Sequence, residues 1–356
     1  MKSSLIALII LCAVGSCKQP DQDPILLNDL QIIGSHNSYK VAIEPAILDY
    51  ITSIDSAEGL SLEYEHISIT DQLDLGLRNL ELDLFYDPAG GYYSDPAGLD
   101  IVRATGAAPQ PFDIERQLSK PGLKVFHIQE IDFRSHQLLF LEALQEIKIW
   151  SEAHPNHSPI IITINAKDHE VPNTRKPITF NRVALRTIDS EILQAFDTQD
   201  LITPDMIRGI YPSLEEAVLT EGWPSVEAVQ GRLMFVLDEL DPKRGRYLSV
   251  YPGLKGAVMF INQEAGNPEA AFMIINNPIK DFDLIRSMVD QGYMVRTRAD
   301  AGTMEARHED YKRFEMAKKS GAQVITTDYY QPSRLFESSF QIRFNDGSYE
   351  RAKLRR

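Results

Sequence analysis

The sequence predicts an α/β fold, a (β/α)8 TIM barrel with loop insertions. Short runs rich in apolar and β-branched residues alternate along the chain with segments whose apolar residues recur at helical spacing. Alternation of this kind indicates a parallel sheet, and eight strands over about 300 residues suit a closed barrel. The segment GSHNS at 34–38, at the end of the first run, is not a Gly-rich dinucleotide fingerprint. An open doubly wound sheet is therefore the less favoured alternative.

Of the eight expected strands, the fourth is the most clearly defined. Its sequence, PIIITINAK at 159–167, is almost entirely apolar, as in a strand that is buried on both faces of a sheet. For the sixth strand the pattern leaves two candidates, AVMFIN at 257–262 and AFMIINN at 271–277. The other strands are expected at residues 30–35, 79–86, 124–129, 232–240, 293–300 and 323–330.

Helical patterns separate several of these strands and cover residues 68–77, 135–155, 281–292 and 304–321. The second pattern ends at Pro155, and the last two close with Gly, a residue that favours helix C-termini. The tail from Ser333 to Arg356 is basic, and we expect it to pack loosely under the barrel. A chain of 356 residues with 43% hydrophobic composition is long enough for one large domain with a sizeable core.

The first residues have the layout of an export signal. A basic start at Lys2 precedes an apolar run, Leu5 to Val14, that is too short to be a good membrane span. The ending AVGSC resembles the lipobox of bacterial lipoproteins, in which Cys17 would be acylated. We expect a membrane-tethered protein of the bacterial cell envelope or, alternatively, a secreted one. The expected segments are a signal peptide at 1–16, a tether at 17–27 and a single barrel domain at 28–356.

Cysteine content and charge exclude several function classes. Cys12 and Cys17 are the two cysteines of the chain, so a mature protein starting at Cys17 would have no thiol for catalysis or zinc binding. The net charge is −15, and loss of residues 1–16 would make it −16. So negative a chain argues against nucleic acid as a partner, and an anionic substrate would need a local positive charge.

Polar side chains are expected to converge at one end of the barrel, because barrel active sites form at the C-terminal ends of the strands. His36 and Asn37 follow the first strand. Three pairs of residues two apart would each point to one face of a strand, and they are Glu81 with Asp83, Asn165 with Lys167, and Arg296 with Arg298. Further polar residues in or at the ends of strands are His127, Asp238, Thr327 and Asp328.

These residue types indicate phosphodiester cleavage. Oxygen ligands from Asn37, Glu81 and Asp83 suit a hard cation such as Ca²⁺ or Mg²⁺. Histidine as a residue type titrates near neutrality, so the pair His36 and His127 can serve as base and acid. Candidate phosphate-binding cations are Lys167, Arg296 and Arg298. The chain contains neither a GxSxG nor an HExxH motif. Glu81 and Asp83 could alternatively be a structural pair matched to arginine, and His127 a hydrogen-bonded core histidine.

Several stretches, taken in order, resemble the secreted bacterial calcium-dependent phosphoinositide-specific phospholipases C, which are PLC-like phosphodiesterases with TIM barrels. They span about residues 31–330, nearly the whole of the expected domain. The stretches are GSHNSYK, HISITDQLDLGLRNLELDLFYDPAGGYY, HIQEIDFRS, WSEAHPNHSPIIITINAKD, VRTRADAGTMEAR and SGAQVITTDYY.

The resemblance implies a mechanism in which the inositol 2-hydroxyl attacks its own phosphodiester and gives a cyclic inositol phosphate. His36 and His127 would act as acid and base, with the assignment between them open. Ca²⁺, rather than Mg²⁺, would stabilise the transition state. Asn165 stands where the related eukaryotic pattern has a Glu, so the fourth metal ligand would be neutral, or the site would shift to Asp168. The implied site comprises metal ligands Asn37, Glu81, Asp83 and Asn165, and substrate-binding residues Lys167, Asp238, Arg296 and Arg298.

The expected substrate is phosphatidylinositol or a soluble glycerophosphoinositol. Two other functions stay open from the sequence. One is a glycerophosphodiesterase-like enzyme or another phosphodiesterase with a different head group. The other is a non-catalytic, lipid-anchored binding protein that has lost its metal because of Asn165. The oligomeric state is not predicted.

Overall fold

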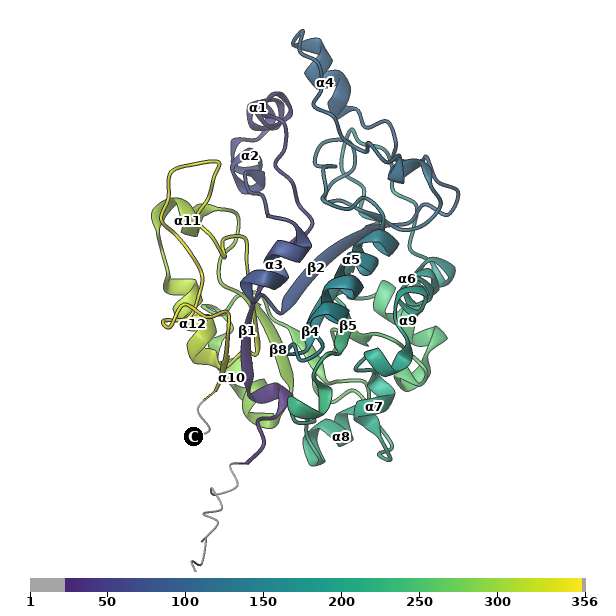
Figure 1. Ribbon diagram of the computed structural model, residues 1–356, viewed down its shortest axis with the longest axis vertical. Coiled ribbons are helices and arrows are strands. Elements are labelled where there is room, and N and C mark those ends of the chain that lie inside the picture. The colour runs from purple at the N-terminus through teal and green to yellow at the C-terminus, as the bar shows by residue number, and fades with distance from the viewer. Residues whose placement is uncertain (1–22, 354–356) are drawn as a thin grey trace, which may run out of the picture.

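The computed structural model of the protein describes residues 23–353, in which eight parallel strands form a barrel (Figure 1). The eight are β1 (Leu30–Ser35), β2 (Asn79–Phe85), β4 (Ile160–Ala166), β5 (Leu233–Leu237), β6 (Phe260–Ile261), β7 (Phe272–Ile274), β8 (Met294–Arg298) and β9 (Val324–Thr327). They pair in the order β6-β5-β4-β2-β1-β9-β8-β7, and a parallel bridge between Asn262 and Phe272 joins the two ends. The predicted (β/α)8 barrel is confirmed.

Helices surround the strands and pack apolar side chains onto them. Local signals set their limits: the Ser68 hydroxyl accepts a hydrogen bond from the backbone N–H of Asp71 at the first turn of α3, and Gly292 ends α10 with a φ of 108°. The helices are α1 (Pro45–Ile54), α2 (Ser56–Leu62), α3 (Ile69–Leu75), α4 (Gly98–Ala104), α5 (Phe140–Ala153), α6 (Arg182–Ala195), α7 (Pro204–Arg208), α8 (Leu214–Thr220), α9 (Lys243–Val250), α10 (Phe282–Gln291), α11 (Met304–His308) and α12 (Lys312–Ser320). Within residues 23–353, none of the helices combines the length and the apolar character that a membrane span requires.

Two of the strand predictions need correction. The segment 124–129 is not a barrel strand: β3 (Lys124–Val125) is a short strand that runs antiparallel to β2. It cannot continue, because the chain turns back at Ile128, whose carbonyl accepts the N–H of Asp132 at 2.9 Å. Both candidates for the sixth strand enter the barrel, as β6 and β7. The barrel therefore has eight strands without this segment.

The glycine of GSHNS lies inside β1 and does not interrupt it. Gly34 is in register with Asn79 at the start of β2. A Cβ atom at Gly34 would lie 2.5 Å from the backbone oxygen of Asn79, so a larger residue would push the two strands apart. The absence of a side chain therefore lets β1 and β2 approach each other just before His36.

The ends of the barrel domain differ from the expectation. As far as Lys353, the tail does not pack loosely, because Phe340 and Ile342 are buried and β10 (Glu350–Ala352) pairs antiparallel with β1. At the other end, Leu27 is buried and Leu26 forms a bridge with Ser225, so the last residues of the expected tether already belong to the fold. The expected signal peptide and the acylation site Cys17 lie outside the described residues.

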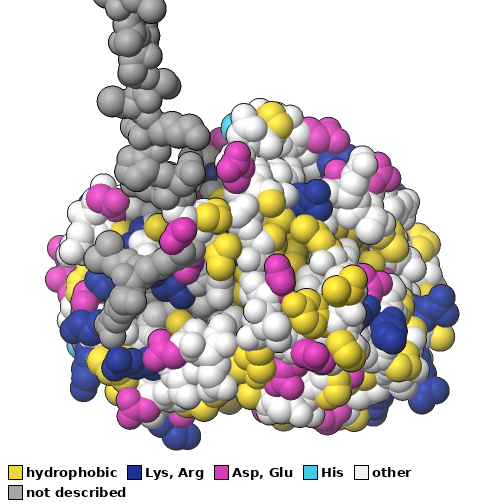
Figure 2. Space-filling model, turned by 90° about the horizontal axis from the view of Figure 1, so that it is seen from below, with side chains coloured by type: hydrophobic (Ala, Val, Ile, Leu, Met, Phe, Trp, Pro, Cys, Tyr) yellow, Lys and Arg dark blue, Asp and Glu magenta, His cyan; other side chains and the backbone are white. Residues whose placement is uncertain are grey.

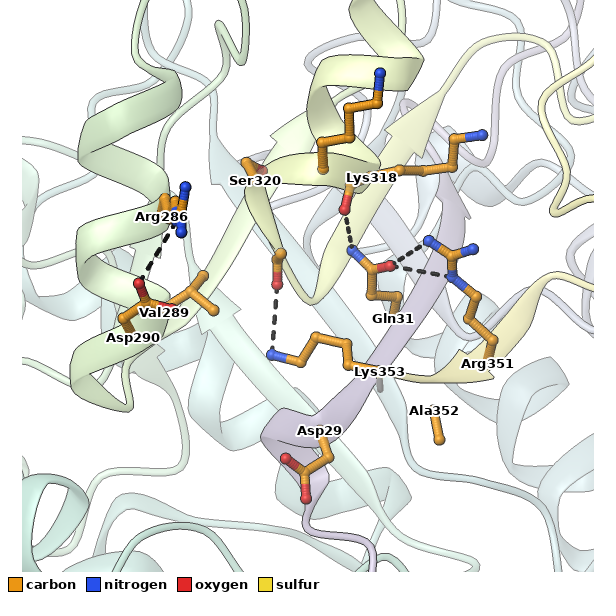
Figure 3. A pocket seen from close by; sticks show the side chains of 12 residues that line it. Asp29, Gln31, Arg286, Val289, Asp290, Lys318, Ser320, Arg351, Ala352 and Lys353 are labelled. Atoms are coloured by element: carbon orange, nitrogen blue, oxygen red, sulfur yellow. Dashed lines mark hydrogen bonds and ion pairs between the residues drawn. The ribbon is translucent and has the colours of Figure 1, made fainter. Parts of the chain in front are cut away.

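Long insertions after β1 and β2 build up the end of the barrel at which the strands finish. Helices α1, α2 and α4 stand beyond this end (Figure 1). They share an apolar cluster that includes Ile47, Leu62, Leu99 and Phe133. The opposite end, seen in Figure 2, mixes apolar, basic and acidic side chains. It carries a pocket of about 590 Å³ in which Lys353 lies beside Gln31 and Arg351 (Figure 3).

Candidate active site

His36 lies directly after β1 and is held by two residues from neighbouring strands. Its Nδ1 is 2.8 Å from Oδ1 of Asp328, which follows β9. Arg298, the last residue of β8, donates to Oδ2 of Asp328 at 2.9 Å and places Nη1 3.3 Å from Nε2 of His36. Burial alone would raise the pKa of Asp328, but the interactions with His36 and Arg298 hold it well below its usual range. An ionised Asp328 therefore orients the ring of His36.

Asp300 stabilises the segment that carries Asp328. It accepts hydrogen bonds from the hydroxyl of Thr327 and, at 3.0 Å, from the backbone N–H of Asp328. Burial, together with the nearby charge of Asp328, raises the pKa of Asp300 above its usual range. The two carboxyl groups thus differ: Asp328 carries the charge that faces His36.

His127 lies in the loop after β3 and has a carboxylate partner of its own. Its Nδ1 is 2.8 Å from Oδ2 of Asp132. The same oxygen accepts a hydrogen bond of 2.6 Å from Nζ of Lys40, whose side chain is entirely buried. Burial would raise the pKa of Asp132, but Lys40 and His127 lower it, so Asp132 is ionised. Both histidines therefore use Nδ1 for a carboxylate, which leaves Nε2 for proton exchange.

The two expected carboxylate ligands on β2 are buried and paired with cations. Glu81 accepts a charged hydrogen bond from Arg296 on β8, and its other oxygen is 3.6 Å from Nε2 of His36. Asp83 lies 3.1 Å from Nζ of Lys167. Asn165 on β4 is in register with Asp83, and its amide nitrogen donates to Glu81 at 3.1 Å. The structure thus brings residues of three strands to one place.

The side chain of Asn37, the residue after His36, is held by Tyr64. The side-chain amide of Asn37 donates to the hydroxyl of Tyr64 at 2.7 Å, and Asn37 has a φ of 50°, a conformation that Asn tolerates better than most residues. The ring of Tyr64 stacks on His36 at 6.2 Å and lies 4.9 Å from Nζ of Lys40. The ring of Tyr64 therefore lies between His36 and Lys40, the cation that contacts Asp132.

The four expected substrate-binding residues do not share one environment. Lys167 and Arg298 keep part of their side chains exposed, whereas Arg296 is 1% exposed and bonds with Glu81 and Asn276. We therefore expect Arg296 to hold Glu81 in place. Asp238, after β5, is 3.9 Å from Arg296, and burial raises its pKa to about 6 despite that cation.

The donor chemistry around Glu81 fits a hard cation. The expected set of two carboxylates and two amides would offer oxygen ligands, with one negative charge fewer than a set with three carboxylates would have. Within residues 23–353, no three His, Cys, Asp or Glu side chains converge closely enough to hold a metal by themselves. A metal here would need the amides of Asn37 and Asn165, whose oxygens must then face it. Asp168 is engaged elsewhere, by Lys243 at 3.2 Å and by the backbone N–H of Phe180 at 2.9 Å.

We predict that Lys167→Met tightens calcium binding by roughly tenfold, because the ammonium group beside Asp83 competes with a divalent cation for the same carboxylate. Isothermal titration calorimetry of the chelator-treated protein measures this change. Lys243→Met is the matched control, since Lys243 pairs with Asp168 and Glu239. Equal calcium affinity in wild type and Lys167→Met would place the metal away from Asp83.

The buried Asp238 gives a pH-dependent stability prediction. Its pKa is about 6 in the folded protein against 3.8 for the ordinary group, so its ionisation destabilises the fold as pH rises from about 4 to 6, by about 1 to 3 kcal/mol. Asp238→Asn should therefore raise Tm by a few degrees at pH 8 and leave it unchanged at pH 4. Calorimetry in chelator at both pH values checks this, and an equal change at the two values would contradict it.

Sequence reasoning missed the aspartate that holds each histidine. Asp328 was noted at the end of the last strand without a role. Asp132 and Lys40 were not singled out, although Lys40 closes the GSHNSYK motif and Asp132 follows His127 by five residues. Neither pairing is visible in the sequence, because a buried carboxylate and its cation come from loops that only the closed barrel brings together. His66 is also buried, and its Nε2 is 2.7 Å from the carbonyl oxygen of His36.

A closed barrel whose mouth combines two carboxylate-bound histidines with cations suited to phosphate defines a class of enzyme, the barrel phosphodiesterases. Comparison with family models specifies the class. The model of calcium-dependent phosphoinositide phospholipase C matches residues 25–353, and the chain belongs to this family of phosphodiesterases. A comparison with curated proteins gives no match.

Solved structures support the fold at low sequence identity. The chain is similar to a calcium-dependent phosphoinositol-specific phospholipase C from a Gram-negative Pseudomonas species in its apo form with myoinositol, with a TM-score of 0.55 and 14% identity over 92% of this chain and 96% of that one. It is also similar to a Ca²⁺-dependent phosphatidylinositol-specific phospholipase C from Streptomyces antibioticus, with a TM-score of 0.52 and 17% identity over 86% of this chain and 95% of that one.

Proposed function

We propose that the protein cleaves an inositol phosphodiester in a calcium-dependent reaction that gives a cyclic inositol phosphate. The observation that carries the proposal is the shared geometry of His36 and His127, each bound through Nδ1 to an ionised, buried aspartate. Such a pair can remove a proton from one oxygen and deliver a proton to another. Membership of the calcium-dependent phosphoinositide phospholipase C family supports the choice of substrate and of metal.

In the proposed reaction, the inositol 2-hydroxyl oxygen forms a bond to phosphorus, and the bond from phosphorus to the alcohol oxygen of the leaving group breaks. One histidine takes the hydroxyl proton at Nε2, and the other gives a proton to the departing oxygen. Arg298, beside His36, is placed to stabilise the phosphate. A bound calcium ion would lower the pKa of the hydroxyl and neutralise charge on the phosphate. Asn37, Glu81, Asp83 and Asn165 would hold it.

The source of the phosphodiester is the finer part of the proposal. We favour phosphatidylinositol, because the family model is that of a phosphoinositide phospholipase. Glycerophosphoinositol is the second candidate, since a net charge of −15 disfavours close approach to anionic membranes. Acylation of Cys17 would tether the enzyme to a membrane of the bacterial cell envelope and remains our proposal for its location.

The function is tested by the product released, which is water-soluble phosphate for the lipid vesicles and glycerol for glycerophosphoinositol, itself a soluble phosphate. Vesicles of phosphatidylinositol, vesicles of phosphatidylglycerol with equal surface charge, and free glycerophosphoinositol are each incubated with the protein, first with calcium and then with chelator. The proposal expects calcium-dependent release from one or both inositol substrates and none from phosphatidylglycerol. Release from phosphatidylglycerol alone would favour another head group. No release from any substrate by calcium-loaded protein would favour a binding protein.

A further inference from the structure

Lys40 is a buried cation that contacts Asp132, the aspartate that holds His127. It does not face the mouth of the barrel. Its side chain is 0% exposed, and Nζ lies 2.6 Å from Oδ2 of Asp132. The same oxygen lies 2.8 Å from Nδ1 of His127, whereas Oδ1 of Asp132 has no hydrogen-bond partner among residues 23–353. Both interactions of this carboxylate therefore converge on a single atom.

We propose that Lys40 is a positioning residue that holds His127 in the tautomer and orientation in which Nε2 faces the substrate. Lys40 acts through Asp132: its ammonium group keeps the carboxylate charged and fixes Oδ2 opposite Nδ1 of His127. The role of His127 in proton transfer rests on the proposed function, but its orientation by Lys40 does not.

The need for a cation follows from the surroundings of Asp132. A carboxylate in a buried site takes up a proton unless charges or hydrogen bonds oppose this, and burial is the largest influence on the pKa of Asp132. Lys40 is the largest opposing influence. A protonated Asp132 could donate a hydrogen bond to Nδ1, which would move the His127 proton to Nε2 and exchange the roles of the two nitrogens.

The other histidine has a similar arrangement with two differences, the first being that His36 and Arg298 contact different oxygens of Asp328, Oδ1 and Oδ2. Arg298 supports Asp328 as Lys40 supports Asp132, but Arg298 also lies 3.3 Å from Nε2 of His36. Arg298 can therefore meet the substrate directly. Lys40 is enclosed between Asp132 and the ring of Tyr64, so its ammonium group acts on His127 through Asp132.

The loops that carry Lys40 and Asp132 are also joined by their backbones. Lys40 forms an antiparallel bridge with Ser135, and the N–H of His136 donates to the carbonyl of Tyr39 at 2.9 Å. These contacts do not involve the ammonium group. A methionine at position 40, which is similar in length and uncharged, can therefore preserve the loop junction while it removes the charge.

The test compares Lys40→Met, Asp132→Asn and the double variant in the full chain. Imidazole ¹⁵N NMR, with His127 assigned from its loss in His127→Ala, is expected to show one tautomer protonated at Nδ1 in wild type and a mixture in Lys40→Met. We expect kcat of Lys40→Met to fall about 10- to 100-fold with KM within about threefold. In the double variant, Tm should recover at least half of the loss in Lys40→Met while kcat stays low.

Lys124→Met is the matched control, because Lys124 is equally buried and pairs with Asp87 rather than with a histidine partner. It should lower Tm without changing the His127 spectrum or kcat. Unchanged His127 signals in Lys40→Met, or wild-type kcat in the double variant, would overturn the proposal. Because the NMR readout needs no substrate, it distinguishes this failure from a failure of the proposed function, in which wild type itself would not cleave inositol substrates.

Discussion

Alanine at His36 or at His127 is expected to lower kcat by about 10²- to 10⁴-fold while the fold persists, because each histidine supplies one of the two proton transfers. Both side chains keep a fraction exposed at the barrel mouth, so their removal leaves no large cavity in the core. The measurement is kcat on an inositol substrate at saturating calcium, with circular dichroism and calorimetry to establish that the variants are folded.

His308→Ala is the matched control for the histidine variants. His308 lies at the end of α11 with an exposed side chain, so its loss should leave kcat unchanged. A near-normal kcat in either His36→Ala or His127→Ala, with calcium bound, would falsify the two-histidine mechanism. An equal loss in His308→Ala would instead indicate that general destabilisation causes the effect.

Asp83→Asn is expected to raise the calcium concentration for half-maximal activity by at least about tenfold, because it removes one of two carboxylates from the proposed ligand set. At saturating calcium, kcat should recover to within a few-fold of wild type, since Asp83 does not contact either histidine. A calcium titration of initial rates checks both statements.

A surface carboxylate provides the control for this titration. Asp100 on α4 is largely exposed and forms a surface ion pair with Arg103, so Asp100→Asn should leave the calcium dependence unchanged. If Asp83→Asn and wild type followed the same calcium titration curve, the metal site would not include Asp83. If activity stayed low at every calcium concentration, Asp83 would act on the substrate rather than on the metal.

Much of the barrel could be predicted because its strands are defined by local pattern. The run Ile160–Ala166 is nearly all apolar, and Gly292 and Gly321 end their helices in the left-handed conformation that glycine favours. The segment 124–129 was misassigned because an apolar, β-rich run looks the same whether it pairs within the barrel or in an insertion. Whether this segment joins the barrel depends on the reversal of the chain at Asp132. That reversal is a tertiary contact, which the pattern of apolar residues does not reveal.

The candidate site was predictable in its residue types but not in its pairings. His36, Glu81 and Asp83 could be placed at the mouth because they follow or lie on strands whose direction the fold determines. The ion pairs from Glu81 to Arg296 and from Asp83 to Lys167 join strands that are distant in the sequence. For the same reason, the burial of Arg296 could not be inferred from the sequence. This burial changes the expected role of Arg296 from binding phosphate to holding Glu81.

Phosphorus NMR of the first product is the most direct test of calcium-dependent attack by the inositol 2-hydroxyl. The protein is mixed with phosphatidylinositol, and spectra are recorded over time with calcium and then with chelator. We expect a calcium-dependent cyclic inositol phosphate signal that appears before any acyclic inositol phosphate. An acyclic inositol phosphate as the first product would contradict attack by the 2-hydroxyl, and the same cyclic product in chelator would contradict a role for calcium.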